Sequence, residues 1–194
     1  TNQVQLTRNP SDYKAVQEIL APNDTSFCGN DIALMILAEP VATKDIRPMV
    51  PRVDKESVTN EEYYAVGYGA TNDGGGGSGL RRRRDDLTID CVGSQCPSYY
   101  SRETEWIGDT GVCQGDSGGP AFDTLDRIIG IASRGSYGCD TPVYGSVFGW
   151  SEWIISETKA AARNAGIEAP NWSVGWPTDP EFSYPIGEIC SSNN

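Results

Sequence analysis

The stretch CQGDSGGP at residues 113–120 decides how the rest of this 194-residue sequence is interpreted. Its glycines allow the backbone to turn so that two N–H groups, those of Gly115 and Ser117, point at one spot. Two such donors stabilise an oxygen that becomes negatively charged during acyl transfer, which is the task of an oxyanion hole. The cysteine, glutamine and proline around this core argue against an ordinary glycine-rich loop. The stretch therefore predicts that Ser117 is a nucleophile.

Four further segments extend the pattern outward. Asp31 stands in the segment NDIAL at residues 30–34, directly before an apolar run, and a Tyr-Gly pair at 68–69 follows a predicted strand. Ser-Arg-Gly at 133–135 precedes a cysteine, and Trp-Ile at 153–154 lies at the start of a predicted helix. In order and spacing, from about residue 28 to 160, these segments and the serine motif resemble the trypsin/chymotrypsin-like serine endopeptidases.

The resemblance implies an all-β fold. It consists of a double antiparallel β-barrel with the active site in the cleft between the barrels, followed by a C-terminal helix. Residues 1–58 are expected to supply the C-terminal part of the first barrel and a linker, and residues 59–150 the second barrel with the nucleophile. Residues 151–166 are expected to form the helix, and residues 167–194 an irregular tail.

The composition agrees with a fold rich in turns and strands. The 22 glycines and 12 prolines predict many turns. Short apolar or aromatic runs between them predict strands at residues 31–37, 63–68, 87–90, 121–122, 127–132 and 143–147. From Ser151 onward apolar residues recur near the helical period, and Gly166 is placed to end that helix.

The resemblance also assigns roles to the site residues. Ser117 is the nucleophile, Asp31 the acid that orients the general base, and Gly115 and Ser117 form the oxyanion hole. Ser133 hydrogen-bonds the Asp31 carboxylate, and the segment 133–135 (Ser133, Arg134 and Gly135) pairs with the substrate backbone and lines the S1 pocket. Asp116 is an activation switch, since in this family it pairs with the N-terminus that proteolysis releases. A buried charge is costly without its partner, which gives the pair its control over the oxyanion hole.

Specificity rests on the residue six positions before the nucleophile, which in this family forms the floor of the S1 pocket. Here that residue is Gly111, so a neutral pocket and an uncharged P1 side chain are expected. Asp109 lies two positions away and need not point inward. The segment after Cys139 is short, so its alignment is ambiguous, and Asp140 remains an alternative that would restore a preference for basic side chains.

Six cysteines, an even number without a zinc-binding spacing, indicate an oxidised protein that is secreted into an extracellular or periplasmic space. The resemblance pairs Cys113 with Cys139 across the S1 pocket. Cys91 and Cys96 are expected to close a tight local loop. Cys28 and Cys190 are left to join each other, or one of them to reach a separate polypeptide.

The sequence contains no histidine. In this family the general base is a histidine that precedes the catalytic aspartate, and without it a serine hydroxyl is a poor nucleophile at neutral pH. The favoured interpretation is a nicked enzyme whose N-terminal fragment carries the histidine and completes the first barrel. A second is an inactive homologue that binds rather than cleaves. A third, Thr1 as an N-terminal nucleophile, has no other support in the sequence.

Charge excludes several other functions. With 27 acidic and 15 basic residues the net charge is −12, which argues against nucleic acid or an anionic membrane as partner. The arginines at 81–84 follow a glycine-rich stretch and adjoin two aspartates, so a solvated, protease-sensitive loop is expected there rather than a polyanion site. No cofactor and no metal are expected, because acidic pairs such as Glu61-Glu62 are typical of a solvated surface. The expected substrates are proteins or peptides.

Overall fold

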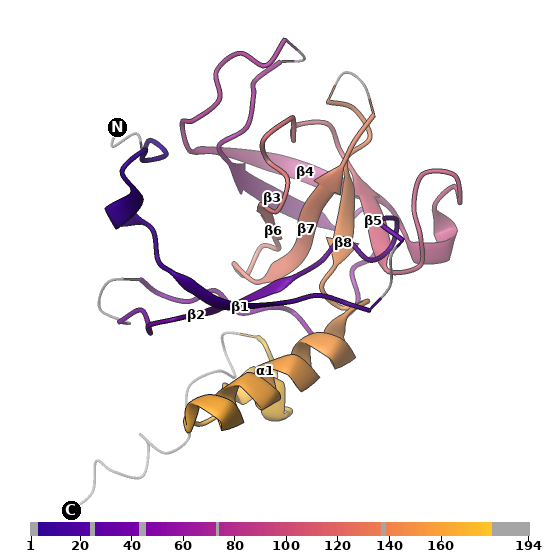
Figure 1. The fold of residues 1–194 in the computed structure, drawn as a ribbon. Helices are drawn as coiled ribbons and strands as arrows, with labels where there is room; N and C mark the ends of the chain where they lie inside the picture. The colour runs from indigo at the N-terminus through magenta and orange to yellow at the C-terminus, as the bar shows by residue number, and fades with distance from the viewer. Residues whose placement is uncertain (1–3, 24–25, 43–45, 73, 137–138, 180–194) are drawn as a thin grey trace, which may run out of the picture.

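A computed structural model describes residues 4–23, 26–42, 46–72, 74–136 and 139–179 (Figure 1). The strands in chain order are β1 (Val16–Leu20), β2 (Leu34–Leu37), β3 (Glu62–Gly67), β4 (Arg82–Val92), β5 (Glu105–Gly108), β6 (Pro120–Phe122), β7 (Ile128–Arg134) and β8 (Val143–Ser146). One α-helix, α1 (Ser151–Ala165), follows the last strand. Short 3-10 turns lie at η1 (Pro10–Asp12), η2 (Gly93–Gln95) and η3 (Asn171–Val174).

Six strands form a closed barrel in the order β3-β4-β5-β8-β7-β6, and every neighbouring pair is antiparallel. Closure removes the free strand edges that would otherwise recruit other chains. This barrel and the C-terminal helix confirm the predicted all-β fold class.

Aromatic rings fill the barrel. Trp106 and Tyr144 stack at 4.1 Å between ring centroids, and Tyr63 meets both of them edge-on. Two glycines leave the room that these rings need: a Cβ on Gly130 would lie 2.4 Å from the Trp106 ring, and one on Gly108 would lie 2.2 Å from the Tyr63 hydroxyl. Close packing of this kind tolerates few changes in volume.

The N-terminal part of the chain forms only a two-stranded sheet, β1 with β2, which lies beside the barrel (Figure 1). Most of its apolar side chains are exposed, for example Ile19 and Met35, each 63% exposed. A sheet of two strands is marginally stable in water and needs a further layer to cover its apolar face.

Helix α1 ends at Gly166, whose left-handed backbone (φ +66°) suits a glycine cap. Ile154 on its inner face packs with Ile32, Val53 and Val147, so the helix joins the N-terminal part of the chain to the barrel. Beyond the helix, the Thr178 hydroxyl and amide both donate to the Asp54 carboxylate, the amide at 2.8 Å. The segment up to Thr178 is therefore docked on the linker.

Two features differ from the prediction. The arginines at 82–84 lie in β4 and pair with Ala65 to Gly67 of β3, so the expected loop is in fact a strand. Strands β1 and β5 were not expected at all. No helix in the described part of the chain is long and apolar enough to cross a membrane.

Candidate active site

The nucleophile motif forms a tight turn between β5 and β6. Gly115 and Gly118 have φ of +95° and +80°, a conformation that glycine adopts without strain. Within the turn the Asp116 amide donates to the Cys113 carbonyl at 3.0 Å, and the Gly118 amide donates to the Ala132 carbonyl at 2.7 Å. The N–H groups of Gly115 and Ser117 make no hydrogen bond to any residue that the structure describes. Both donors are therefore free to bind an oxyanion.

Ser117 and Asp31 meet across Ser133, although they are 86 residues apart in the sequence. The Ser117 hydroxyl lies 3.5 Å from the carbonyl oxygen of Ser133, on β7. The Ser133 hydroxyl donates to the Asp31 carboxylate at 2.7 Å, so the hydrogen bond implied by the resemblance is present. Ser117 is exposed and Asp31 half-buried, so both side chains are open to an incoming group.

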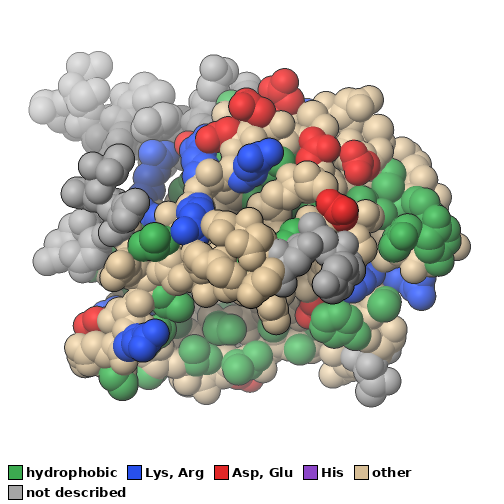
Figure 2. Space-filling view, turned by 90° about the horizontal axis from the view of Figure 1, so that it is seen from above, with side chains coloured by type: hydrophobic (Ala, Val, Ile, Leu, Met, Phe, Trp, Pro, Cys, Tyr) green, Lys and Arg blue, Asp and Glu red, His purple; other side chains and the backbone are tan. Residues whose placement is uncertain are grey.

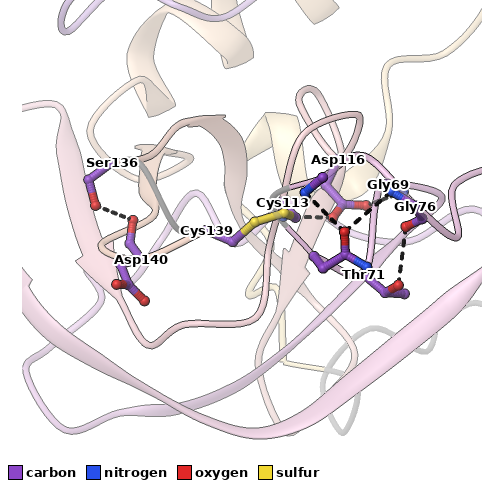
Figure 3. Close-up of a disulfide and its surroundings, with 10 residues drawn as sticks. Gly69, Thr71, Gly76, Cys113, Asp116, Ser136, Cys139 and Asp140 are labelled. Carbon is purple, nitrogen blue, oxygen red and sulfur yellow. Dashed lines mark hydrogen bonds between the residues drawn. A yellow bond between two sulfur atoms is a disulfide. The ribbon is translucent and has the colours of Figure 1, made fainter.

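The Asp116 side chain points towards the backbone of Gly69 and Cys113 (Figure 3). Its carboxylate accepts hydrogen bonds from the amides of Gly69, at 2.7 Å, and Cys113, at 2.9 Å. Glycine at positions 67 and 69 is required by this approach, because a Cβ on either would lie within 2.5 Å of the carboxylate. Among the described residues no cation forms a salt bridge with Asp116, which lines a cavity of about 410 Å³.

A second pocket of about 340 Å³ opens beside Ser117. Ser133, Arg134 and Gly135 form one wall, as expected. Gly111 does not line this pocket; it lies in the neighbouring cavity of Asp116, where a Cβ would meet the Arg84 side chain at 3.0 Å. The role of Gly111 as the floor of the S1 pocket therefore stays a prediction.

The described residues contain two disulfides, Cys113–Cys139 and Cys91–Cys96. The first joins the nucleophile turn to the segment after β7 and so holds the two walls of the Ser117 pocket together (Figure 3). Cys28 makes no disulfide within the described residues. Cys190 lies outside the described residues, as does most of the predicted tail.

A buried ion pair beside the site was missed by sequence reasoning. Glu105, 1% exposed, accepts two hydrogen bonds from the Arg134 guanidinium, at 2.6 and 2.8 Å. Burial alone would raise the pKa of Glu105, but the hydrogen bonds from Arg134 and from two backbone amides outweigh it and lower the pKa. The only local sign is a glutamate directly before the apolar pair Trp-Ile at 106–107.

Charged groups do not form a metal centre in the described part of the chain, where no cluster of three or more acidic or cysteine ligands occurs. Seen from the loop end of the barrel, basic and acidic side chains are interspersed rather than gathered into one positive patch (Figure 2).

Comparisons with known proteins identify relatives of this chain. The family model described as Trypsin matches residues 1–154. The chain is 33% identical over 148 residues to a trypsin of Phaedon cochleariae, covering 67% of the chain and 55% of that protein. It is 31% identical over 146 residues to transmembrane protease serine 11E of Mus musculus, covering 66% of the chain and 34% of that protein.

Solved structures share the fold at low identity. A mutant of human heparin binding protein superposes with a TM-score of 0.63 at 19% identity, covering 78% of this chain and 72% of that one. Another structure, of human heparin binding protein, gives a TM-score of 0.61 at 20% identity, covering 74% of this chain and 65% of that one. The chain spans about half the length of the trypsins that it matches.

Proposed function

Since this chain belongs to the trypsin family of serine proteases, we propose that it is the nucleophile-bearing part of a secreted serine endopeptidase. The observation that carries the proposal is the meeting of Ser117 and Asp31 across Ser133, beside two unengaged amides. A serine and a carboxylate linked through one residue, beside two amides without a partner among the described residues, are what acyl transfer requires, and this supports the proposal. Two disulfides support the proposal of an oxidising compartment.

The proposed reaction is acyl transfer. The Ser117 hydroxyl attacks the peptide carbonyl carbon while its proton passes to an imidazole, and the amides of Gly115 and Ser117 bind the oxyanion. The imidazole then gives the proton to the leaving amine, the C–N bond breaks, and the acyl group stays on Ser117. Water, deprotonated by the same imidazole, releases the acyl group. Asp31 orients the imidazole and stabilises its charged form.

The imidazole has to come from a segment that this sequence does not contain, since there is no histidine in it. We propose that an N-terminal fragment of the same precursor supplies it and packs on the exposed face of β1 and β2. The exposed apolar side chains of that sheet support this partner, because their burial would drive association.

Activation is proposed to act through Asp116. Its carboxylate lines a cavity large enough for a chain end, and its two amide donors leave the negative charge without a salt-bridge partner among the described residues. An α-amino group entering the cavity would supply that partner and fix the nucleophile turn.

Labelling with a fluorophosphonate probe tests the hydrolase directly. The protein isolated with any companion polypeptide should be labelled at Ser117, and the variant Ser117→Ala should not be. The variant Ser136→Ala, which changes an exposed serine of the same pocket, should retain labelling. Intact mass under denaturing conditions should reveal a second, histidine-containing species.

An inactive homologue that acts as a binding module is the second candidate, and the absence of histidine is the observation that favours it. Complete inertness of Ser117 to the probe, together with a single 21.0 kDa species in the intact-mass spectrum, would establish this alternative.

Specificity for an uncharged P1 residue is proposed from the lining of the Ser117 pocket. Its one charged side chain among the described residues is Arg134, which is paired with Glu105. Asp140 is absent from that lining. Peptide substrates that differ only in Arg, Phe or Ala at P1 should show lower kcat/KM for Arg. A clear preference for Arg would contradict this assignment.

A further inference from the structure

We propose that Glu105 is the positioning residue of the site: its buried carboxylate fastens the segment that carries Asp31 to the strand that carries Ser133. The inference rests on the proposed function, because the placement of Asp31 matters to chemistry only if the site hydrolyses its substrate.

The two segments come from different parts of the fold. Asp31 lies in the connection before β2, outside the closed barrel, whereas Ser133 lies in β7, within it. Nothing in the barrel closure itself places the first segment against the second. A specific connection between them is therefore needed to bring the Ser133 hydroxyl to 2.7 Å from the Asp31 carboxylate.

Glu105 supplies that connection with both of its oxygens. One oxygen accepts from the Gly29 amide at 2.8 Å and from Arg134 at 2.6 Å. The other accepts from the Arg102 amide at 2.8 Å and from Arg134 at 2.8 Å. The Thr104 hydroxyl adds a bond to the Gly29 carbonyl at 2.6 Å, so the peptide two residues before Asp31 is held from both sides.

Arg134 extends the connection to the hydrogen bond between Ser133 and Asp31. Besides binding Glu105, its guanidinium donates to the Ser133 hydroxyl at 3.3 Å and to the Tyr100 carbonyl at 2.9 Å. The Ser133 hydroxyl therefore accepts from Arg134 while it donates to Asp31. Burial of Glu105 strengthens each of these bonds and makes the loss of either charged partner costly.

Attraction of acidic substrates is a competing role for Arg134, since it lines the Ser117 pocket. Its two terminal nitrogens are, however, committed to four acceptors, two of them oxygens of one carboxylate. The Arg134–Glu105 ion pair therefore presents little net charge to the Ser117 pocket. A bidentate guanidinium–carboxylate pair of this kind is suited to fixing the relative position of two segments.

The Gly29 backbone also fits closely against the residues before Glu105. It is buried with φ of +90°, and a Cβ would lie 3.1 Å from the Arg102 side chain and 3.3 Å from the Thr104 hydroxyl. Only glycine combines this conformation with so close an approach. The fit supports the view that this peptide is docked on the Glu105 strand rather than resting there by chance.

Nuclear magnetic resonance of the full chain tests the connection without requiring activity. The variant Glu105→Gln removes the charge at nearly constant shape, and Glu103→Gln is the matched control on an exposed glutamate two residues away. In Glu105→Gln the Gly29 amide proton should shift upfield, and the Asp31 carboxyl carbon resonance should move as well. Both signals should keep their wild-type positions in Glu103→Gln.

Kinetics of the enzyme assembled with its histidine-bearing partner give the second readout. Glu105→Gln should lower kcat by roughly 10- to 100-fold with little change in KM, because misplacement of the orienting acid affects the chemical step rather than substrate binding. Should Glu105→Gln fail to fold, as judged by circular dichroism, Arg134→Lys replaces it, since it keeps the charge and loses the fork.

The outcomes separate the two claims. Unchanged Gly29 and Asp31 resonances in a folded variant overturn the positioning role, whatever the activity. Changed resonances in a protein whose Ser117 never reacts uphold the positioning role and overturn the proposed hydrolysis.

Discussion

Gly130 lies against the Trp106 ring in the centre of the barrel, where an added methyl group has no space. We expect Gly130→Ala to lower the free energy of unfolding by about 1–3 kcal/mol, because a Cβ there would lie 2.4 Å from a fully buried ring. Urea denaturation measures the change. Gly145→Ala on the neighbouring strand is the control, since its Cβ would meet its nearest neighbour at an ordinary 3.5 Å. Equal losses in both variants would contradict the packing argument.

Glu105 should make stability depend on pH in the acid range. Its folded pKa is lowered below the unfolded value of about 4.3, so its contribution is present above that value and is lost as pH falls through the folded pKa. Between pH 6 and pH 2, the free energy of unfolding should fall less steeply with decreasing pH in Glu105→Gln than in the wild type. The same pH dependence in both proteins would mean that the ion pair does not contribute to stability.

Sequence reasoning places residues well where the chemistry is local. Ser117 and its two amides lie within a few residues of one another, so the motif alone fixes their relation. The role of Glu105 could not be predicted, because a charged side chain can be buried only when partners are present, and its partners lie at positions 29, 102 and 134. Nothing near Glu105 in the sequence indicates them.

At the scale of the elements, the segment after α1 is docked rather than free. Thr178 is 1% exposed and donates to Asp54, and it also accepts a hydrogen bond from Arg127 at 3.2 Å. Burial alone would raise the pKa of Asp54, but the bonds from Thr178 lower it. The extension beyond the family match therefore stabilises the linker between the N-terminal sheet and the barrel.

We expect Thr178→Val to lower the free energy of unfolding by about 1 kcal/mol, through loss of the hydrogen bonds from its hydroxyl at nearly constant volume. Thr110→Val, at an exposed threonine, should change it little. Thermal unfolding measures both variants. A stable wild-type protein truncated after residue 169 would refute the docking role.

Strands were predictable where apolar residues alternate or cluster, as in β3 and β8. β4 begins with three arginines and was expected to be a loop, because its first part is exposed and only its pairing with β3 makes it a strand. β1 was missed for the same reason, since its residues Val16–Leu20 show no buried face in this chain. β5 was missed because a charged residue opens a short buried strand.

At the scale of the whole molecule, the sheet of β1 and β2 leaves apolar side chains exposed that a globular protein would normally bury. Ile19 and Met35 are paired across the two strands and each is 63% exposed. We expect the double variant Ile19→Lys/Met35→Lys to weaken binding of the proposed histidine-bearing fragment by at least about tenfold, since burial of each side chain is worth about 1.5–3 kcal/mol.

Sedimentation of the mixed fragments measures that affinity. Tyr99→Ser, which removes an aromatic side chain that is 78% exposed on the barrel, is the control and should bind as the wild type does. Unaltered affinity in the double variant would mean that the partner docks elsewhere.

The hydroxyl of Ser133 has a consequence for how the proposed two-fragment enzyme would regain activity. Because it already aims the carboxylate at position 31, the larger piece is preorganised before its counterpart arrives. The partner would then need only to bring its imidazole, because the Asp31 carboxylate is already in position. After mixing, activity should therefore recover with second-order association kinetics rather than through a slow first-order rearrangement.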